Sequence, residues 1–216
     1  MRAAINGSIE TARKHLSDKD KKNNDGDTAY TFASQAGQGA ILELLDPTDE
    51  DGETALMRAA ERGDVEAVRA LIPLQKGRQT LRKININGVW IFRRGTALMR
   101  AASCEHAEVV RLLVDHEGGM QDSYGYTALM YAAQHGHTEC VKLLAEQEAG
   151  MQDEDGWTAL MKAVAGNNLE CARLLTEREK GIKTTRKCYG FLPGTTALDI
   201  ARRRGLTRII SILSDE

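Results

Sequence analysis

A short motif, Thr-Ala-Leu or Thr-Ala-Tyr, recurs along the chain. It occurs six times, beginning at Thr28, Thr54, Thr96, Thr127, Thr158 and Thr196. Two consecutive intervals, 96–127 and 127–158, are both 31 residues long. A fixed period of this size is typical of one supersecondary unit stacked on copies of itself. Such a stack has a continuous core and an extended surface, without one deep site where catalytic groups converge. The repeat therefore predicts an elongated protein that functions by binding.

Each copy of the motif predicts the start of a short helix. Thr127 is a good N-cap, and strong helix formers follow it over 128–133. A turn near 135–137 and a second helix from 138 to about 146 complete the unit. The turn carries residues that accept a positive φ at a helix C-terminus, namely Gly37, Gly63, Gly136, Gly205 and, once, Asn167.

Small and medium apolar residues dominate the predicted core, because aromatic residues are only 5% of the chain. Alanine pairs at 59–60, 101–102 and 132–133 would let neighbouring first helices approach closely. Leucine pairs at 112–113, 143–144 and 174–175 are expected to fill the space behind them. Cys140 and Cys171 occupy the same place in successive copies, so we predict core positions for both rather than a disulfide or a metal site.

The full pattern, Gly-x-Thr-Ala-Leu-Met-x-Ala-Ala-x-x-Gly-His, resembles the ankyrin repeat, in which Pro and His stand where this chain has Ala and Met. The resemblance covers nearly the whole chain, and its connectors are most similar to the large ankyrin arrays of diplomonad protists. It implies an all-α solenoid of stacked helix-turn-helix units with short β-turn or hairpin connectors. The period of 31 rather than about 33 implies shorter connector tips than is usual.

We expect a single ankyrin-repeat domain over 1–216. It would consist of a partial repeat at 1–24 and repeats near 25–50, 51–92, 93–122, 123–153, 154–192 and 193–216, with inserts at 76–94 and 180–194. Lys14 and His15 stand where other copies have the leucine pair, which predicts a solubilising cap. The alternative is that the chain is part of a longer array. Asp46-Pro47 is expected to end one second helix early.

The first insert contains a hairpin signal, Asn87-Gly88 between alternating apolar residues. A two-residue loop would place four side chains on one face, Ile84, Ile86, Val89 and Ile91. That face is expected to pack on the array. Trp90 and Phe92 would lie on the other face, either covered by the short connector of the second repeat or exposed to a partner. We favour an intramolecular role, because an isolated hairpin is marginally stable.

Charge is unevenly distributed although the net charge is −2. Residues 76–94 hold six basic residues and no acid, 180–208 hold eight against Asp199 alone, and 43–66 are mainly acidic. We hypothesise that the two inserts, about 30 Å apart at roughly 8–10 Å per layer, grip an acidic segment of a partner. Solvated linker charge is the alternative. The candidate basic residues are Arg82, Lys83, Arg93, Arg94, Arg186 and Lys187.

No catalytic motif occurs in the sequence: there is no phosphate-cradling glycine loop, no G-x-S-x-G and no HExxH. His135-Gly-His137 is interpreted as helix capping rather than as a metal site. We therefore predict a protein that is not an enzyme and has no cofactor, metal or small-molecule substrate. No apolar run approaches the ~20 residues of a membrane span and no signal peptide is evident, so we expect a cytoplasmic protein.

The ankyrin resemblance implies that a protein partner meets the connector tips and the exposed side of the first helices. Those positions here are Asp27, Glu53, Glu61, Arg62, Tyr124, Tyr126, Gln134, His135, Glu154, Asp155 and Trp157. Tyr126 and Trp157 precede the threonine in neighbouring copies, so we expect them side by side, as interface anchors or as covers for the connectors. The leading hypothesis is a non-enzymatic interaction module or scaffold.

Two alternative functions remain. One is binding of nucleic acid or another anionic surface through the basic inserts, which would need steep salt dependence and which the near-neutral net charge disfavours. The other is an accessory array joined to a kinase-like parent protein.

Overall fold

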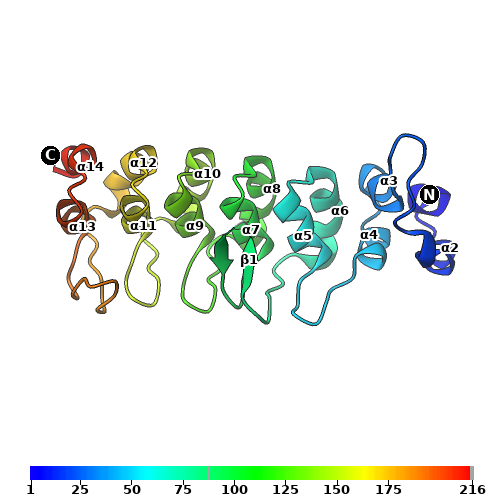
Figure 1. Ribbon diagram of the computed structural model, residues 1–216, viewed down its shortest axis with the longest axis horizontal. Coiled ribbons are helices and arrows are strands. Elements are labelled where there is room, and N and C mark those ends of the chain that lie inside the picture. The colour runs from blue at the N-terminus through cyan, green and yellow to red at the C-terminus, as the bar shows by residue number, and fades with distance from the viewer. Residues whose placement is uncertain (87, 215–216) are drawn as a thin grey trace.

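The computed structural model describes residues 1–86 and 88–214 and forms one row of stacked helix pairs (Figure 1). The first helices of the pairs are Arg2–Asn6 (α1), Ala29–Gln35 (α3), Ala55–Arg62 (α5), Ala97–Ser103 (α7), Ala128–His135 (α9), Ala159–Ala165 (α11) and Ala197–Arg203 (α13). The second helices are Ile9–Lys14 (α2), Gly39–Leu45 (α4), Val65–Gln75 (α6), Ala107–Glu117 (α8), Thr138–Glu148 (α10), Leu169–Glu179 (α12) and Thr207–Ser214 (α14). A 3₁₀ turn spans Leu16–Asp18. The predicted helical solenoid is confirmed.

The repeat threonines cap six of the first helices. In each, the hydroxyl accepts the N–H three residues on, at 3.2–3.4 Å. The turn residues predicted to take positive φ do so, from 58° at Asn167 to 83° at Gly136. Glu105 takes the same conformation in the α7–α8 turn, at φ 64°. The local chemistry of the motif therefore fixes where these helices begin and end.

The core lies between the first and second helices. The alanine pairs are fully buried, and Cys140 and Cys171 are core residues as predicted. The expectation for the leucine pairs is half wrong, because only the second leucine of each is buried and Leu174 is 37% exposed. Adjacent residues of a helix point about 100° apart, so only one of the two can face the first helices. Among the described residues, no helix is both long enough and apolar enough to cross a membrane.

Buried glutamates join successive units. Glu148, at the end of α10, accepts the N–H of Leu129 on α9 (2.6 Å) and that of Gly119 in the preceding connector (3.1 Å). Glu117 and Glu179 make the equivalent pairs of bonds. Gln75 takes this place in the third unit and accepts only from Leu56, at 2.8 Å. The connector before that unit begins at Asp46-Pro47, where α4 ends as predicted and proline offers no N–H.

The first insert forms the predicted hairpin, with strands Ile84–Ile86 (β1) and Val89–Ile91 (β2) paired Ile84 to Ile91 and Ile86 to Val89. Asn87 lies outside the described residues. Ile86 and Ile91 are buried, which confirms that the aliphatic face packs on the array. Trp90 is 49% exposed, with Lys83 Nζ 4.6 Å from its ring centroid.

The other aromatic residue of the hairpin is covered, but not by the element we expected. Phe92 packs on Tyr124 of the following connector, with 4.3 Å between ring centroids. The short connector of the second repeat lies on the opposite side of the insert along the stack, so it is the next unit that covers this ring (Figure 1).

Candidate functional site

An aspartate five residues before the repeat threonine folds three of the four connectors that carry no insert, and Asn23 takes its place in the first of them. Before α11, Asp153 Oδ1 accepts the N–H groups of Asp155 (3.0 Å) and Trp157 (2.8 Å). Its Oδ2 lies 2.6 Å from Nζ of Lys162 on α11. Two other connectors repeat this arrangement, with the pairs Asp122–Tyr131 (2.7 Å) and Asp49–Arg58 (3.2 Å). A long polar side chain on the first helix thus anchors the loop below it.

Both inserts lack this aspartate and carry an apolar residue instead, Ile91 or Phe191. In the unit after the first insert, Arg100 is fully buried and reaches back to Glu53 (2.6 Å) and Glu61 (3.1 Å) of the preceding unit. These two predicted partner-binding carboxylates are therefore engaged within the array, because Arg100 has no aspartate in its own connector. In the last unit, Phe191 joins a cluster of aromatic rings.

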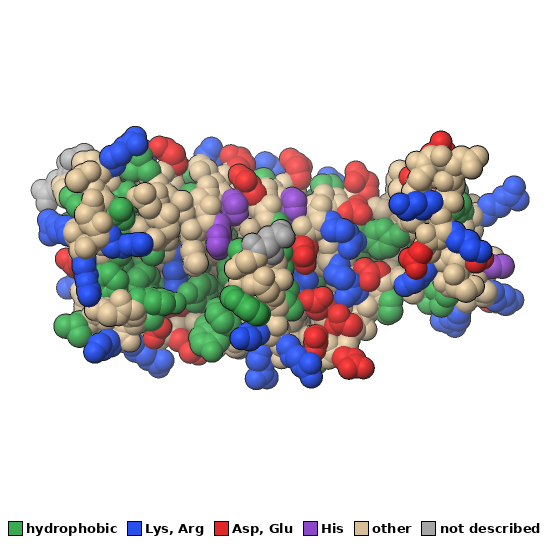
Figure 2. Space-filling view, in the orientation of Figure 1, with side chains coloured by type: hydrophobic (Ala, Val, Ile, Leu, Met, Phe, Trp, Pro, Cys, Tyr) green, Lys and Arg blue, Asp and Glu red, His purple; other side chains and the backbone are tan. Residues whose placement is uncertain are grey.

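Six aromatic side chains from four consecutive connectors form what we call the aromatic groove: Phe92, Tyr124, Tyr126, Trp157, Tyr189 and Phe191. At one end, the ring centroid of Phe92 lies 4.3 Å from that of Tyr124 and 5.9 Å from that of Tyr126. At the other end, Trp157 lies 5.4 Å from Tyr189 and 5.8 Å from Phe191. Hydrophobic side chains gather over these connectors, with basic side chains around them (Figure 2).

The ammonium of Lys162 joins the two ends of the groove. Its Nζ lies 3.9 Å from the ring centroid of Tyr126 and 5.1 Å from that of Trp157, and it donates to Tyr126 Oη at 2.6 Å. Burial raises the pKa of Tyr126 to about 12. The pKa of Tyr189 is also raised to about 12, chiefly by the charge that Tyr126 would carry. Both phenols therefore keep their protons at neutral pH and can donate hydrogen bonds.

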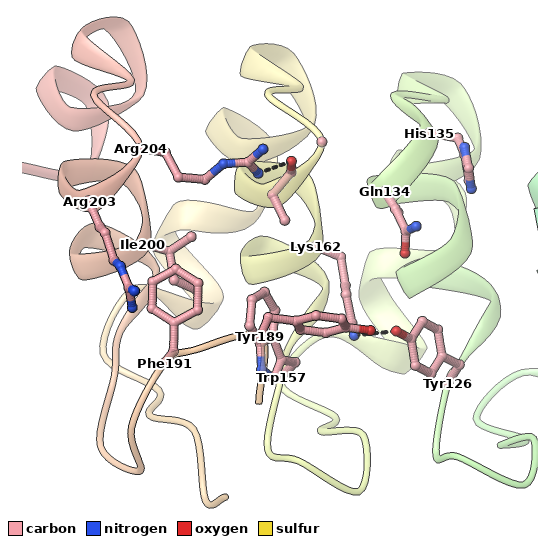
Figure 3. A pocket seen from close by; sticks show the side chains of 12 residues that line it. Tyr126, Gln134, His135, Trp157, Lys162, Tyr189, Phe191, Ile200, Arg203 and Arg204 are labelled. Atoms are coloured by element: carbon pink, nitrogen blue, oxygen red, sulfur yellow. Dashed lines mark hydrogen bonds between the residues drawn. The ribbon is translucent and has the colours of Figure 1, made fainter. Parts of the chain in front are cut away.

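A pocket of about 630 Å³ opens beside the groove, between α9, α11 and α13 (Figure 3). It exists because α11 ends in two small residues, Ala165 and Gly166, between larger neighbours. Gln134 and His135 line it from α9, whereas Arg203 and Arg204 line it from the α13 side. Burial and the nearby His137 lower the pKa of His135, which favours its neutral ring.

A smaller hollow of about 290 Å³ lies toward the connector tips. Phe92 of the first insert and Tyr189 of the second both line it, together with Glu154 and Asp155. The inserts start three connectors apart, but their aromatic side chains converge on this hollow. These rings of the two inserts therefore lie closer together than the expected 30 Å between the inserts, while the hypothesis that the basic residues grip an acidic segment stays a prediction.

The basic residues of the first insert mostly make contacts within the chain. Arg82 pairs with Asp51 at 3.0 Å, Arg93 donates to the carbonyl of Leu81 at 3.0 Å, and Arg94 donates to Gln79 at 3.3 Å. Arg186 and Lys187 of the second insert are exposed. These contacts explain the positions of the three arginines without a partner.

The predicted partner-binding residues divide by exposure. Tyr124 is 52% exposed, Gln134, His135 and Glu154 are exposed, and Asp155 and Asp27 are half-buried. Trp157 is only 2% exposed, because Tyr189 and Phe191 cover it, so it supports the groove from below. Arg62 donates to Tyr30 Oη at 2.8 Å.

Sequence reasoning missed five residues of this site, Lys162, Tyr189, Phe191, Arg203 and Arg204. A signal for the two arginines was present: they stand seven and eight residues after Thr196, as Gln134 and His135 stand after Thr127. Gln134 and His135 were selected because they lie on the exposed side of a first helix, and the same criterion selects the two arginines. Nothing in the repeat pattern points to the residues of the second insert.

His137, which sequence reasoning assigned to helix capping, makes no side-chain capping bond and instead bonds to the preceding unit, as does His106 at the same place in the previous copy. His137 Nε2 lies 3.1 Å from the carbonyl oxygen of Ser103, and His106 Nε2 lies 2.8 Å from that of Glu61. Over residues 1–86 and 88–214, no group of three or more His, Cys, Asp or Glu side chains is placed to hold a metal ion.

Comparison with known proteins identifies the repeat. A family model described as ankyrin repeats (3 copies) matches residues 1–87, 79–151 and 145–216. The structure is similar to the ankyrin repeat domain of Bcl-3, described as a unique member of the IkappaB protein family, with a TM-score of 0.66, 23% identity and coverage of 99% of this chain and 96% of that one. It is also similar to EF0377, an ankyrin repeat protein, with a TM-score of 0.62, 24% identity and coverage of 99% and 95%. No curated protein sequence matches the chain, and the narrower resemblance to diplomonad arrays stays a prediction.

Proposed function

Because the chain belongs to the ankyrin-repeat family, we propose that it is a non-enzymatic interaction module that binds a partner protein through the aromatic groove and the adjoining first-helix face. Ankyrin repeats generally mediate protein–protein interaction. The observation that carries the proposal is the exposure of large aromatic rings beside a pocket. Tyr189 lines both the 630 Å³ pocket and the 290 Å³ hollow and is 71% exposed. Tyr124 lines the 290 Å³ hollow and is 52% exposed.

Exposed aromatic residues beside a pocket are typical of a surface that binds a partner. A tyrosine offers a large apolar area and a hydroxyl while losing little side-chain entropy on binding, and such residues dominate interface energetics. The supporting residues are already held in place, since Lys162, Asp153 and Trp157 are buried beneath them. A preformed site of this kind loses little free energy to ordering when a partner binds.

An affinity pull-down from a lysate of the source cell, at low and moderate salt, tests the proposal. The baits are wild type, a groove variant Tyr124→Ala/Tyr189→Ala, and a control Lys142→Ala/Glu146→Ala on the exposed side of α10. We expect proteins that wild type and the control retain at both salt concentrations and that the groove variant loses. Circular dichroism establishes that all three are equally folded.

Two other results lead to different functions. If the groove variant retains the same proteins as wild type at both salt concentrations, the proposal is contradicted. If the groove variant retains the same proteins as wild type at low salt and both lose them at moderate salt, the second candidate is supported. In that case an anionic ligand is held by the exposed basic residues Arg186 and Lys187.

A further inference from the structure

The pocket between α9, α11 and α13 has apolar walls and two arginines on its α13 side, so it favours some partner segments over others. We propose that it binds a segment of a partner protein in which a bulky apolar side chain is followed or preceded by carboxylates. The apolar side chain would fill the pocket over Ala165 and Gly166, and the carboxylates would pair with Arg203 and Arg204. This inference rests on the proposed function and names the chemistry of the partner.

The shape of the pocket accounts for the apolar side chain. Its volume of about 630 Å³ lies within the range of about 300–1,000 Å³ that is typical of ligand pockets. The rings of Trp157 and Phe191, with Ile200, give it apolar walls. Gly166 lets the end of α11 lie close against α9, because a Cβ at this position would lie 2.4 Å from the carbonyl oxygen of Gln134.

The two arginines account for the carboxylates. Arg203 Nη1 donates to the carbonyl of Gly190 at 2.6 Å, and its guanidinium lies 4.7 Å from the Phe191 ring centroid. Arg204 donates to the carbonyl of Ala165. Over the described residues, neither guanidinium is paired with a carboxylate. Each is thus oriented by one carbonyl and keeps further N–H donors, the geometry that suits bidentate binding of a carboxylate.

The remaining charges around the pocket set the direction of the segment. The ammonium of Lys162 is already neutralised by Asp153 at 2.6 Å, so it does not compete for the ligand. Glu154 and Asp155 line the smaller hollow at the connector tips. Carboxylates of the partner would be repelled there and attracted toward the α13 side, where Figure 3 shows Arg203 and Arg204. The segment is therefore expected to place its acidic residues on the α13 side.

The test uses the full chain and a phage-displayed library of random 12-residue peptides as the probe. We expect wild type to enrich peptides that combine a bulky apolar residue with neighbouring Asp or Glu. The affinity of an enriched synthetic peptide is then measured by fluorescence anisotropy against three variants. Arg203→Glu/Arg204→Glu reverses the pocket charges, and Ala165→Phe fills the pocket. Arg202→Glu/Arg208→Glu makes the same change of net charge at exposed positions that do not line this pocket.

Each pocket variant is expected to weaken binding by about tenfold or more, the equivalent of one or two lost exposed ion pairs or of one lost apolar contact. The control should bind within about twofold of wild type. The inference is overturned if the library enriches no motif or one without acidic residues, or if the control loses as much affinity as Arg203→Glu/Arg204→Glu. If lysate proteins depend on Tyr124 and Tyr189 while the library gives no such motif, the proposed function stands and this inference alone fails.

Discussion

At the scale of single residues, buried charges hold this array together in two different ways. The connector aspartates are paired with a basic or phenolic group on the first helix, whereas the glutamates at the ends of the second helices accept mainly backbone N–H groups. Asp122, Asp153 and these glutamates are withdrawn from water, whereas Asp49 is exposed, so the buried ones depend on their partners to offset the cost of burial. One carboxylate of each kind can be tested by substitution.

The Lys162–Asp153 pair is expected to be sensitive to loss of one partner. Replacing Lys162→Met leaves the Asp153 carboxylate buried without its cation, so we expect the free energy of unfolding to fall by about 3–5 kcal/mol. The matched control is Lys142→Met, which removes an exposed pair with Glu139 and should cost about 1 kcal/mol or less. Urea denaturation measures both, and equal losses would contradict the assignment.

Glu148 gives a prediction about pH. Burial raises its pKa above the ordinary value of 4.5, despite the two N–H groups that favour the ionised form. A raised carboxyl pKa gives stability that is complete below pH 4.5 and is lost as the pH rises through the folded-state pKa. Because Glu148→Gln resembles the protonated acid, we expect wild type and variant to be equally stable near pH 4 and the variant to be the more stable at pH 7. A less stable variant at pH 7 in urea titrations would show that the N–H bonds outweigh the burial.

At the scale of elements, helix ends are set by the motif, while their surroundings differ from unit to unit. Gly37 and Gly63 end α3 and α5 with φ near 65° and 71°. A Cβ on Gly37 would meet nothing within 4 Å, whereas one on Gly63 would lie 2.7 Å from the ring of His106. A side chain would thus be strained by the backbone at both positions, and at Gly63 it would also meet a neighbouring ring.

These two glycines form a matched pair for measurement. Gly37→Ala should cost about 1–2 kcal/mol of unfolding free energy, the penalty of a left-handed conformation alone. Gly63→Ala should cost more, since His106 must move and its bond to the carbonyl of Glu61 at 2.8 Å is then strained or lost. Thermal or urea unfolding of the two variants checks the order, and a reversed order would show that His106 adapts without cost.

Prediction from the sequence succeeds where structure is local. The threonine caps, the positive-φ turns and the hairpin of 84–91 follow from neighbouring residues, and each is found as expected. The placement of Phe92 and the fold of the second insert depend on which connectors meet across the stack, and that information is not local. The burial of Trp157 has the same origin, because the residues that cover it come 32 and 34 positions later.

At the scale of the whole molecule, the units differ in how much they bury. The second helices α6, α8, α10 and α12 each have 11 residues, whereas α2 has six and α4 has seven. Most of the fully buried large side chains lie between α4 and α10. Stability in a stacked array is a sum of unit and interface contributions, so it should be highest in the middle of the row.

Hydrogen exchange followed by mass spectrometry would show this gradient. We expect amides of α7–α10 to exchange slowest and those of α1–α2 to exchange fastest, because local opening is easiest where little apolar surface is buried. Exchange at one uniform rate across all pairs would instead indicate a single cooperative unit.

The buried Arg100 has a consequence for how such a chain can change by gene duplication. The segments 118–148 and 149–179 each carry their own connector aspartate and its partner, so either could be copied in tandem and fold beside its parent. The unit that contains Arg100 could not be moved in this way. It requires a preceding neighbour that supplies the carboxylates of Glu53 and Glu61. The order of these two units is therefore inherited as one block, while the segments 118–148 and 149–179 are free to multiply.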